Sequence, residues 1–140
     1  MLDCLILGDS IAQGISQSRP ECMAIVQKGV TSQGFKYEAI NRPSFINKNW
    51  NTIVISLGTN DYRWDVTETY LRMLRERITA DRVLWILPQA KFSRARNAVL
   101  MVADAHGDQT IEVPEKLLSK DKIHPTATGY KQLAEQTKKK

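Results

Sequence analysis

The chain has 140 residues, of which 42% are hydrophobic and 25% charged, with a formal net charge of +5 at pH 7. This length suits one domain that buries about two-thirds of its unfolded surface. No apolar run approaches the roughly 20 residues of a membrane span, and the start MLDCLILGDS lacks the pattern of a signal peptide. We therefore expect one domain over residues 1–140 without a membrane span, which is cytoplasmic unless a lytic or specialised route releases it.

Five short apolar segments are each followed by a turn signal, which is typical of buried parallel strands. They are Leu2 to Leu7, Met23 to Gln27, Thr52 to Leu57, Val83 to Leu87 and Gln109 to Val113. Segments with helical periodicity separate them. This alternation predicts an α/β domain with a five-stranded parallel sheet covered on both faces.

The helices are predicted from periodicity and from proline. The first covers Ile11 to Ser18 and is stopped by Pro20, and the region Ser32 to Asn49 should form a short helix and a loop. Three longer helices should bury one face each. Their inner faces are predicted to comprise Val66, Tyr70, Leu74 and Ile78, then Ala95, Ala98, Val99, Val102 and Ala103, and lastly Ala127, Tyr130, Leu133 and Ala134 in a helix that begins near Pro125.

Several residues of interest have structural interpretations. Trp50 and Trp85 should lie in the core, and His106 beside Gly107 should end a helix. Cys4 and Cys22 are too few for a disulfide scaffold, so two reduced thiols are expected, although their positions near neighbouring strands allow a bridge.

The terminal lysines 138–140 account for part of the positive charge. No aromatic residues are interleaved with them, as they are in many nucleic-acid-binding segments. They are interpreted as a solvated helix end, so no nucleic-acid partner is predicted. The sequence does not determine the oligomeric state, and a monomer is assumed.

Polar residues cluster after the predicted strands. In an open parallel sheet, ligands bind outside the carboxyl ends of the strands. The segments there include Gly8-Asp9-Ser10, Gly58-Thr59-Asn60-Asp61 and the loop with Asp121 and His124. Each segment alone could be a turn or a helix cap.

Together, the three segments supply the parts of one reaction. A serine becomes a nucleophile when a histidine accepts its proton, and a carboxylate orients that histidine. Ser10, His124 and Asp121 have these residue types. The Asn60 amide and backbone N–H groups could stabilise the oxyanion of an acyl-transfer intermediate.

The blocks "LGDSIAQG", "QKGVTSQG", "SLGTND" and "DKIHPTATGY" occur in an order that resembles the SGNH, or GDSL-type, hydrolase superfamily. The resemblance covers nearly the whole chain. It implies a flavodoxin-like three-layer sandwich with strand order 2-1-3-4-5, and a serine esterase without a metal or organic cofactor.

The resemblance also implies roles for individual residues. Ser10 would be the nucleophile, His124 the general base and Asp121 the orienting carboxylate, while Asp9 would hold the turn. The oxyanion hole would use Asn60 and the N–H of Ser10.

The second block departs from the family pattern. A glycine usually supplies a further oxyanion N–H there, and spacing from the strand places Ser32 at that position. Gly29 and Gly34 are alternatives.

A substrate-binding role is considered for Tyr62, Arg63 and Trp64, which follow the third block and could line the rim or pack on the next helix. Lys91, Arg94 and Arg96 add positive charge that could lie near the same rim or on a solvated helix face.

The short chain leaves no room for a large lid, so an open site is expected. Such a site favours small acyl groups, such as O-acetyl groups on a carbohydrate. The alternatives are a thioesterase or lysophospholipase with the same triad, and a non-catalytic flavodoxin-like module that binds FMN or another phosphate ligand.

Overall fold

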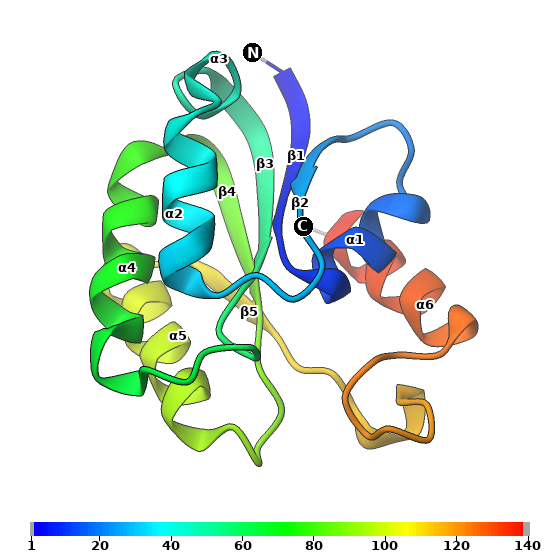
Figure 1. Ribbon diagram of the computed structural model, residues 1–140. Coiled ribbons are helices and arrows are strands. Elements are labelled where there is room, and N and C mark those ends of the chain that lie inside the picture. Colours follow the sequence, from blue (N-terminus) through cyan, green and yellow to red (C-terminus); the bar gives the residue numbers. More distant parts are fainter. Residues whose placement is uncertain (1, 139–140) are drawn as a thin grey trace.

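The structure is a computed structural model that describes residues 2–138, except the side chains of residues 2, 40, 44 and 45. Its centre is a five-stranded parallel sheet with the order β2-β1-β3-β4-β5. Helices α2, α4 and α5 cover one face, and α1 and α6 cover the other (Figure 1). The predicted three-layer α/β fold and strand order are confirmed.

The strands lie where the apolar segments predicted them, with shifted ends. Their bounds are β1 Leu2–Gly8, β2 Met23–Val26, β3 Asn49–Ser56, β4 Thr79–Ile86 and β5 Gln109–Ile111. β3 and β4 begin earlier than predicted because Asn49 pairs with Thr79 and Thr52 with Arg82 in register. Strand pairing uses backbone groups, so polar residues at a strand's start join the ladder without an apolar signal.

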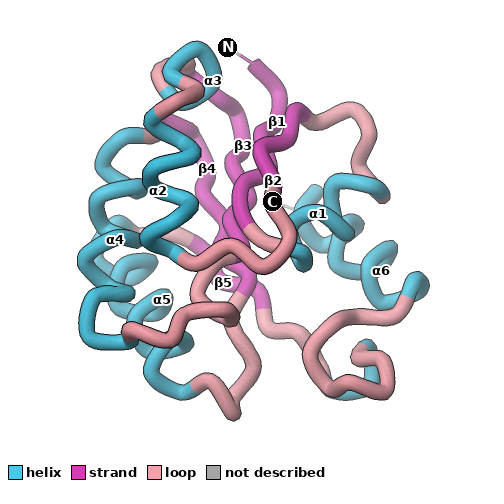
Figure 2. Tube along the Cα trace, in the orientation of Figure 1, coloured by secondary structure: helices cyan, strands magenta, loops and turns pink. Residues whose placement is uncertain are grey.

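The helices are α1 Ser10–Gln17, α2 Ser32–Ile40, α3 Pro43–Ile46, α4 Trp64–Arg77, α5 Ser93–His106 and α6 Ala127–Lys138, with a 3-10 turn, η1, over Glu115–Leu117. The helices and the loops between them are distinguished by colour in Figure 2. The region from Ser32 to Asn49 therefore holds two helices rather than one. Pro43 is at the first position of α3, where a proline is favoured because its missing N–H would have no helical partner.

The buried helical faces match the predictions in part. The predicted face of α5 is confirmed. On α4 the buried residues are Thr67, Leu71 and Leu74, whereas Val66 and Tyr70 are only half-buried. Ala127 is exposed because it is the first residue of α6, outside the stretch that packs on the sheet.

The core consists of two apolar layers, one on each face of the sheet. Trp50 and Trp85 lie in the layer beneath α2, α4 and α5, with relative exposures of 1% and 0%. Ile11 and Ile15 of α1 pack with Leu133 of α6 in the other layer. The two tryptophans are therefore core residues, as predicted.

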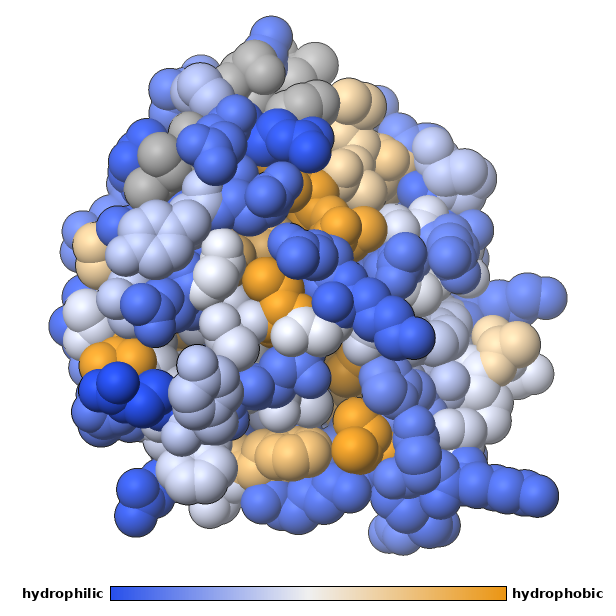
Figure 3. Space-filling model, in the orientation of Figure 1, coloured by the Kyte–Doolittle hydropathy of each residue, from blue (hydrophilic) through white to orange (hydrophobic). Residues whose placement is uncertain are grey.

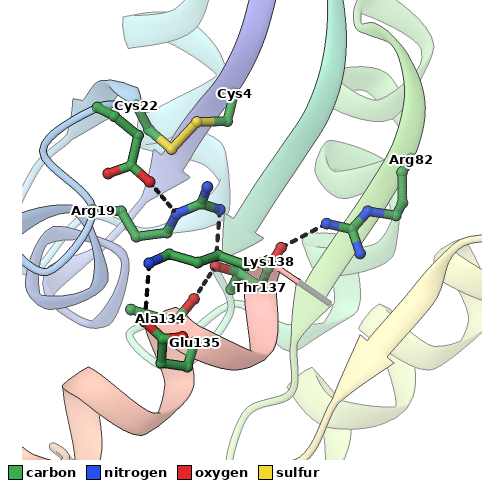
Figure 4. A network of polar contacts seen from close by, with 9 residues as sticks. Cys4, Arg19, Cys22, Arg82, Ala134, Glu135, Thr137 and Lys138 are labelled. Atoms are coloured by element: carbon green, nitrogen blue, oxygen red, sulfur yellow. Dashed lines mark hydrogen bonds and ion pairs between the residues drawn. A yellow bond between two sulfur atoms is a disulfide. The ribbon is translucent and has the colours of Figure 1, made fainter. Parts of the chain in front are cut away.

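The cysteines form a disulfide between β1 and the segment before β2 (Figure 4). The expectation of two reduced thiols is wrong. Cys4 lies on β1 and Cys22 directly precedes the neighbouring strand β2. Their Cα atoms are 4.9 Å apart, which is within the range for a bridge. The cytoplasmic location remains a prediction from the sequence.

A polar network beside the disulfide holds the end of α6 (Figure 4). The buried Arg19 donates to the Thr137 hydroxyl, and Arg82 of β4 donates to the Thr137 carbonyl. These bonds tie the last turn of α6 to the loop after α1 and to the sheet. Lys138 is the last described residue of that helix, and the remaining terminal lysines lie outside the described residues. In the described part of the chain, no helix is both long and apolar enough to span a membrane.

Candidate active site

Ser10 lies at the point where β1 meets α1. Gly8 ends the strand with φ +135°, and Asp9 forms the N-cap of α1, so Ser10 is the first helical residue. The Asp9 carboxylate accepts from the N–H groups of Ile11 and Ala12. The sharp turn presents the half-buried Ser10 side chain at the carboxyl edge of the sheet.

Ser10, His124 and Asp121 form a continuous hydrogen-bonded chain. The Ser10 Oγ lies 2.9 Å from His124 Nε2, across 114 positions of sequence. The His124 Nδ1 lies 2.6 Å from Asp121 Oδ2. An imidazole held between a carboxylate and a serine hydroxyl can accept the serine proton.

The loop before α6 fixes the histidine. Asp121 Oδ1 accepts from the N–H groups of Ile123 and His124 and from the Ser119 hydroxyl. Lys122 adopts φ +61°, which lets the loop fold back on the carboxylate. The bond to His124, aided by these N–H groups, holds the pKa of Asp121 well below its usual value, so its carboxylate stays charged beside the imidazole.

Asp9 differs from Asp121 in its surroundings. It is 1% exposed, and its Oδ2 has no hydrogen-bond partner among the described residues. Burial raises its pKa from 3.8 to about 6, although the Ser56 side chain and the N–H groups of Ala12 and Ile11 oppose this shift. Asp9 is therefore a cap whose charge is costly to bury.

This burial predicts a pH-dependent stability. Between the two pKa values the folded protein holds a proton that the unfolded chain has released, so Asp9 contributes stability below pH 3.8 that is lost as the pH rises through about 6. Asparagine caps a helix about as well and carries no charge. The unfolding free energy of Asp9→Asn should therefore exceed that of wild type by an amount that grows with pH. The increase between about pH 4 and pH 8 should be on the order of 3 kcal/mol.

Chemical denaturation at several pH values measures this gain. Asp81→Asn removes an exposed carboxylate from β4 and should show the wild-type pH dependence. A difference between wild type and Asp9→Asn that does not vary with pH would contradict the prediction.

Ser32 does not have a free N–H for an oxyanion in this structure. It begins α2, and its N–H donates to Asp61 Oδ1 at 2.8 Å. Asp61 Oδ2 accepts from the Thr67 hydroxyl at 2.7 Å. An N–H that already donates to a carboxylate is not available to the intermediate, so the expected role of Ser32 is not supported. This carboxylate is part of the "SLGTND" block, in which Asp61 directly follows Asn60. The sequence did not indicate which N–H group donates to it.

The other oxyanion candidates have different geometries. Asn60 Nδ2 donates to the Val30 carbonyl at 3.2 Å, which anchors the amide with one of its two hydrogens. The Gly34 N–H donates to the Thr31 hydroxyl. Gly29 lies in an exposed turn with φ +78°.

The predicted rim residues separate into two hollows. Tyr62 and Arg63 line one with Thr31, and Arg63 is paired with Asp65. Trp64 lines another.

That second hollow is also lined by Lys91, Phe92, Ser93 and Arg94. Arg96 turns away from it, because it bonds to Glu112 and to the Pro88 carbonyl. Of the three cations considered near the rim, the structure therefore places two in a hollow. In residues 2–138, no group of three or more His, Cys, Asp or Glu side chains could hold a metal ion.

Comparison with known proteins gives a likeness in structure but none in sequence. No protein-family model and no curated protein matches the chain. A GDSL-like lipase from Bacteroides thetaiotaomicron superposes with a TM-score of 0.68 and 20% identity, over 96% of this chain and 88% of that one. A lipase/acylhydrolase from Enterococcus faecalis superposes with a TM-score of 0.72 and 15% identity, over 96% of this chain and 92% of that one.

The chain has the GDSL fold. A third protein with this fold is the C-terminal catalytic domain of peptidoglycan O-acetyltransferase A from Streptococcus pneumoniae, with a TM-score of 0.66 and 14% identity over 96% of this chain and 88% of that one. At these identities the likeness concerns the GDSL fold alone. The function has to be argued from the residues of this chain.

Proposed function

We propose that the protein is a serine hydrolase that cleaves carboxylic esters of small acyl groups. The observation that carries this proposal is the chain of contacts from Ser10 through His124 to Asp121. A serine 2.9 Å from an imidazole nitrogen whose other nitrogen faces a carboxylate is arranged for nucleophilic acyl transfer. The structurally similar proteins support this reaction class, since their names describe a lipase, an acylhydrolase and an O-acetyltransferase.

The reaction has two halves. Ser10 Oγ attacks the ester carbonyl carbon while His124 takes its proton, and His124 then protonates the departing alcohol as the acyl-enzyme forms. Water attacks the acyl-enzyme, with His124 again accepting and returning the proton, and releases the acid. Asp121 keeps Nδ1 protonated and offsets the positive charge that forms on the ring.

The oxyanion is assigned to Ser10 and Asn60. The N–H of Ser10 is the first of α1, and first-turn N–H groups have no partner within the helix. Asp9 accepts from the next two N–H groups, so the Ser10 N–H would be the one that donates to the oxyanion. The second hydrogen of the Asn60 amide would complete the pair.

Substitution of Asn60 tests this assignment. Asn60→Ala should lower kcat on p-nitrophenyl acetate by about 10²- to 10³-fold with a small change in KM, since the oxyanion exists only in the transition state and intermediate. Asn97→Ala removes an exposed amide from α5 and serves as the control. An Asn60→Ala variant with wild-type kcat would overturn the assignment.

The exposure of the triad favours small acyl groups. The side chains of His124 and Asp121 are 39% and 46% exposed. A site this open to solvent offers little apolar surface to a long acyl chain. A small acyl group on a bulky carrier, such as an O-acetylated carbohydrate, fits it best.

Chain-length preference distinguishes this proposal from a lysophospholipase. Purified protein is assayed with p-nitrophenyl acetate, butyrate and octanoate, and Ser10→Ala provides the blank. We expect the acetate to be cleaved fastest. A preference for octanoate would favour the lysophospholipase alternative, and rates equal to the blank on every ester would overturn the proposed hydrolase.

A phosphate-binding module is disfavoured by the first turn. The N-terminus of α1, where a phosphate of FMN would bind, is already capped by the Asp9 carboxylate. A second negative group at this position would be repelled whenever Asp9 is charged. A flavin absorbance band in the purified protein would contradict this argument.

A further inference from the structure

The hollow between α4 and α5 combines aromatic and cationic side chains at the edge of the sheet that carries Ser10. Trp64 begins α4, and Lys91 to Arg94 lead into α5. The hollow is open to solvent. In Figure 3 the same edge of the sheet, in the lower part of the view, has hydrophobic residues bordered by hydrophilic ones.

The two cations of the hollow are held by rings rather than by acids. The Arg94 guanidinium lies 5.7 Å from the centre of the Trp64 ring, and Lys91 Nζ lies 5.4 Å from that of Phe92. No ion pair joins either cation to a carboxylate among the described residues, whereas Arg96 beside them is paired with Glu112. The hollow thus has two positive charges available to a ligand.

The side chains of the hollow favour a ligand that has both a carboxylate and an apolar face. An arginine and a lysine bind a carboxylate through charge-assisted hydrogen bonds, and an exposed indole offers a flat apolar face. Trp64 is 46% exposed, so part of its indole ring is accessible to a ligand. A sugar acid presents both an apolar ring face and a carboxylate.

The topology sets the distance to the nucleophile. Ser10 follows β1, Trp64 follows β3, and Lys91 follows β4, with β3 next to both β1 and β4. Neighbouring strands are about 4.8 Å apart, so β1 and β4 are separated by about 10 Å. The hollow is farther than this from Ser10, because α4 and α5 cover one face of the sheet and α1 covers the other. A ligand that reaches both places is longer than a single sugar.

We infer that Trp64, Lys91, Phe92 and Arg94 form a binding subsite for an acidic sugar unit of an esterified oligo- or polysaccharide. The inference rests on the proposed hydrolase function, since it names the carrier of the acyl group. The subsite holds a uronic-acid unit that lies farther along the same carbohydrate chain than the unit whose ester is presented to Ser10.

Binding to a catalytically silent protein tests the subsite. Titration calorimetry on Ser10→Ala uses a tetramer of galacturonic acid as the probe and neutral xylotetraose as its uncharged counterpart. The acidic tetramer should bind at least about 10-fold more tightly, because charge-assisted contacts distinguish the two. Adding Arg94→Ala or Lys91→Ala should weaken this binding about 10-fold, and high salt should weaken it as well.

Arg77→Ala provides the charge-matched control, because it removes an exposed cation from the opposite end of α4. It should leave the affinity for the acidic tetramer unchanged. Equal binding of the acidic and neutral tetramers would overturn the subsite. So would equal affinities of the Arg94→Ala and Arg77→Ala proteins, or tighter binding of a thymidine tetranucleotide than of the acidic tetramer.

A separate assay keeps this outcome distinct from the proposed function. Wild-type hydrolysis of p-nitrophenyl acetate reports the triad alone, since this ester is too small to reach the hollow. Cleavage without discrimination between the tetramers rejects the subsite and retains the hydrolase. Selective binding without cleavage rejects the hydrolase and retains the subsite.

Discussion

Removal of His124 should lower kcat/KM for p-nitrophenyl acetate by about 10⁴-fold or more, to near the level of Ser10→Ala. His124 is the group that accepts the Ser10 proton, at 2.9 Å, and among the described residues no other side chain forms a hydrogen bond with the Ser10 hydroxyl. Without it the hydroxyl has no base, and a neutral hydroxyl is a weak nucleophile.

His106 provides a matched control, since it is the other of the two histidines in the chain. It ends α5, where its Nδ1 lies 3.1 Å from the Val102 carbonyl oxygen. His106→Ala should retain wild-type activity. The rate of wild type should also fall on acidification, because a protonated imidazole cannot accept the serine proton.

A fluorophosphonate probe separates loss of chemistry from loss of structure. It should label Ser10 in wild type and in His106→Ala, label His124→Ala far more slowly, and leave Ser10→Ala unlabelled. Circular dichroism checks that all four proteins are folded. Wild-type activity in a folded His124→Ala protein would reject the proposed triad.

Gly8→Ala should destabilise the fold by at least about 4 kcal/mol, which is exceptional for one methyl group. A Cβ at this position would lie 1.9 Å from the carbonyl oxygen of Ser56 on the neighbouring strand. That oxygen also accepts the Asp9 N–H at 3.0 Å. The Ser56 carbonyl is a backbone group, and the added Cβ is attached directly to the backbone of β1. Relief of the clash therefore requires β1 and β3 to separate at the turn that presents Ser10.

Gly107→Ala distinguishes the clash from backbone strain. Gly107 also has a positive φ, +67°, but a Cβ there would meet no atom within 4 Å. Its replacement should cost only the 1–2 kcal/mol of a left-handed alanine. Urea denaturation measures both variants, and equal losses would show that the close approach of β1 and β3 is not what requires glycine at position 8.

Much of the fold follows from local patterns in the sequence. Short apolar runs such as that from Leu2 to Leu7 predict buried strands because a strand covered on both faces needs apolar residues at every position. The small residues of α5 predict its buried face for a similar reason. Local patterns failed for Ala127 and Tyr70, since a repeat of about 3.6 residues does not show where along a helix the contact with the sheet begins and ends.

The sequence by itself determined which residue types the chain offers for chemistry: a serine after the first strand, an asparagine after the third, and an aspartate and histidine three positions apart before the last helix. Their residue types and order were enough to predict the reaction class.

Only the tertiary structure decided which of these groups are free to act. The Ser32 N–H is taken by Asp61, the two cysteines are bridged, and Lys91 and Arg94 share a hollow with Trp64 whereas Arg96 does not. Each of these outcomes depends on a contact between segments that follow different strands. A hydrogen bond or an ion pair forms with the group that is nearest in space, and the packing of the strands and helices sets that distance.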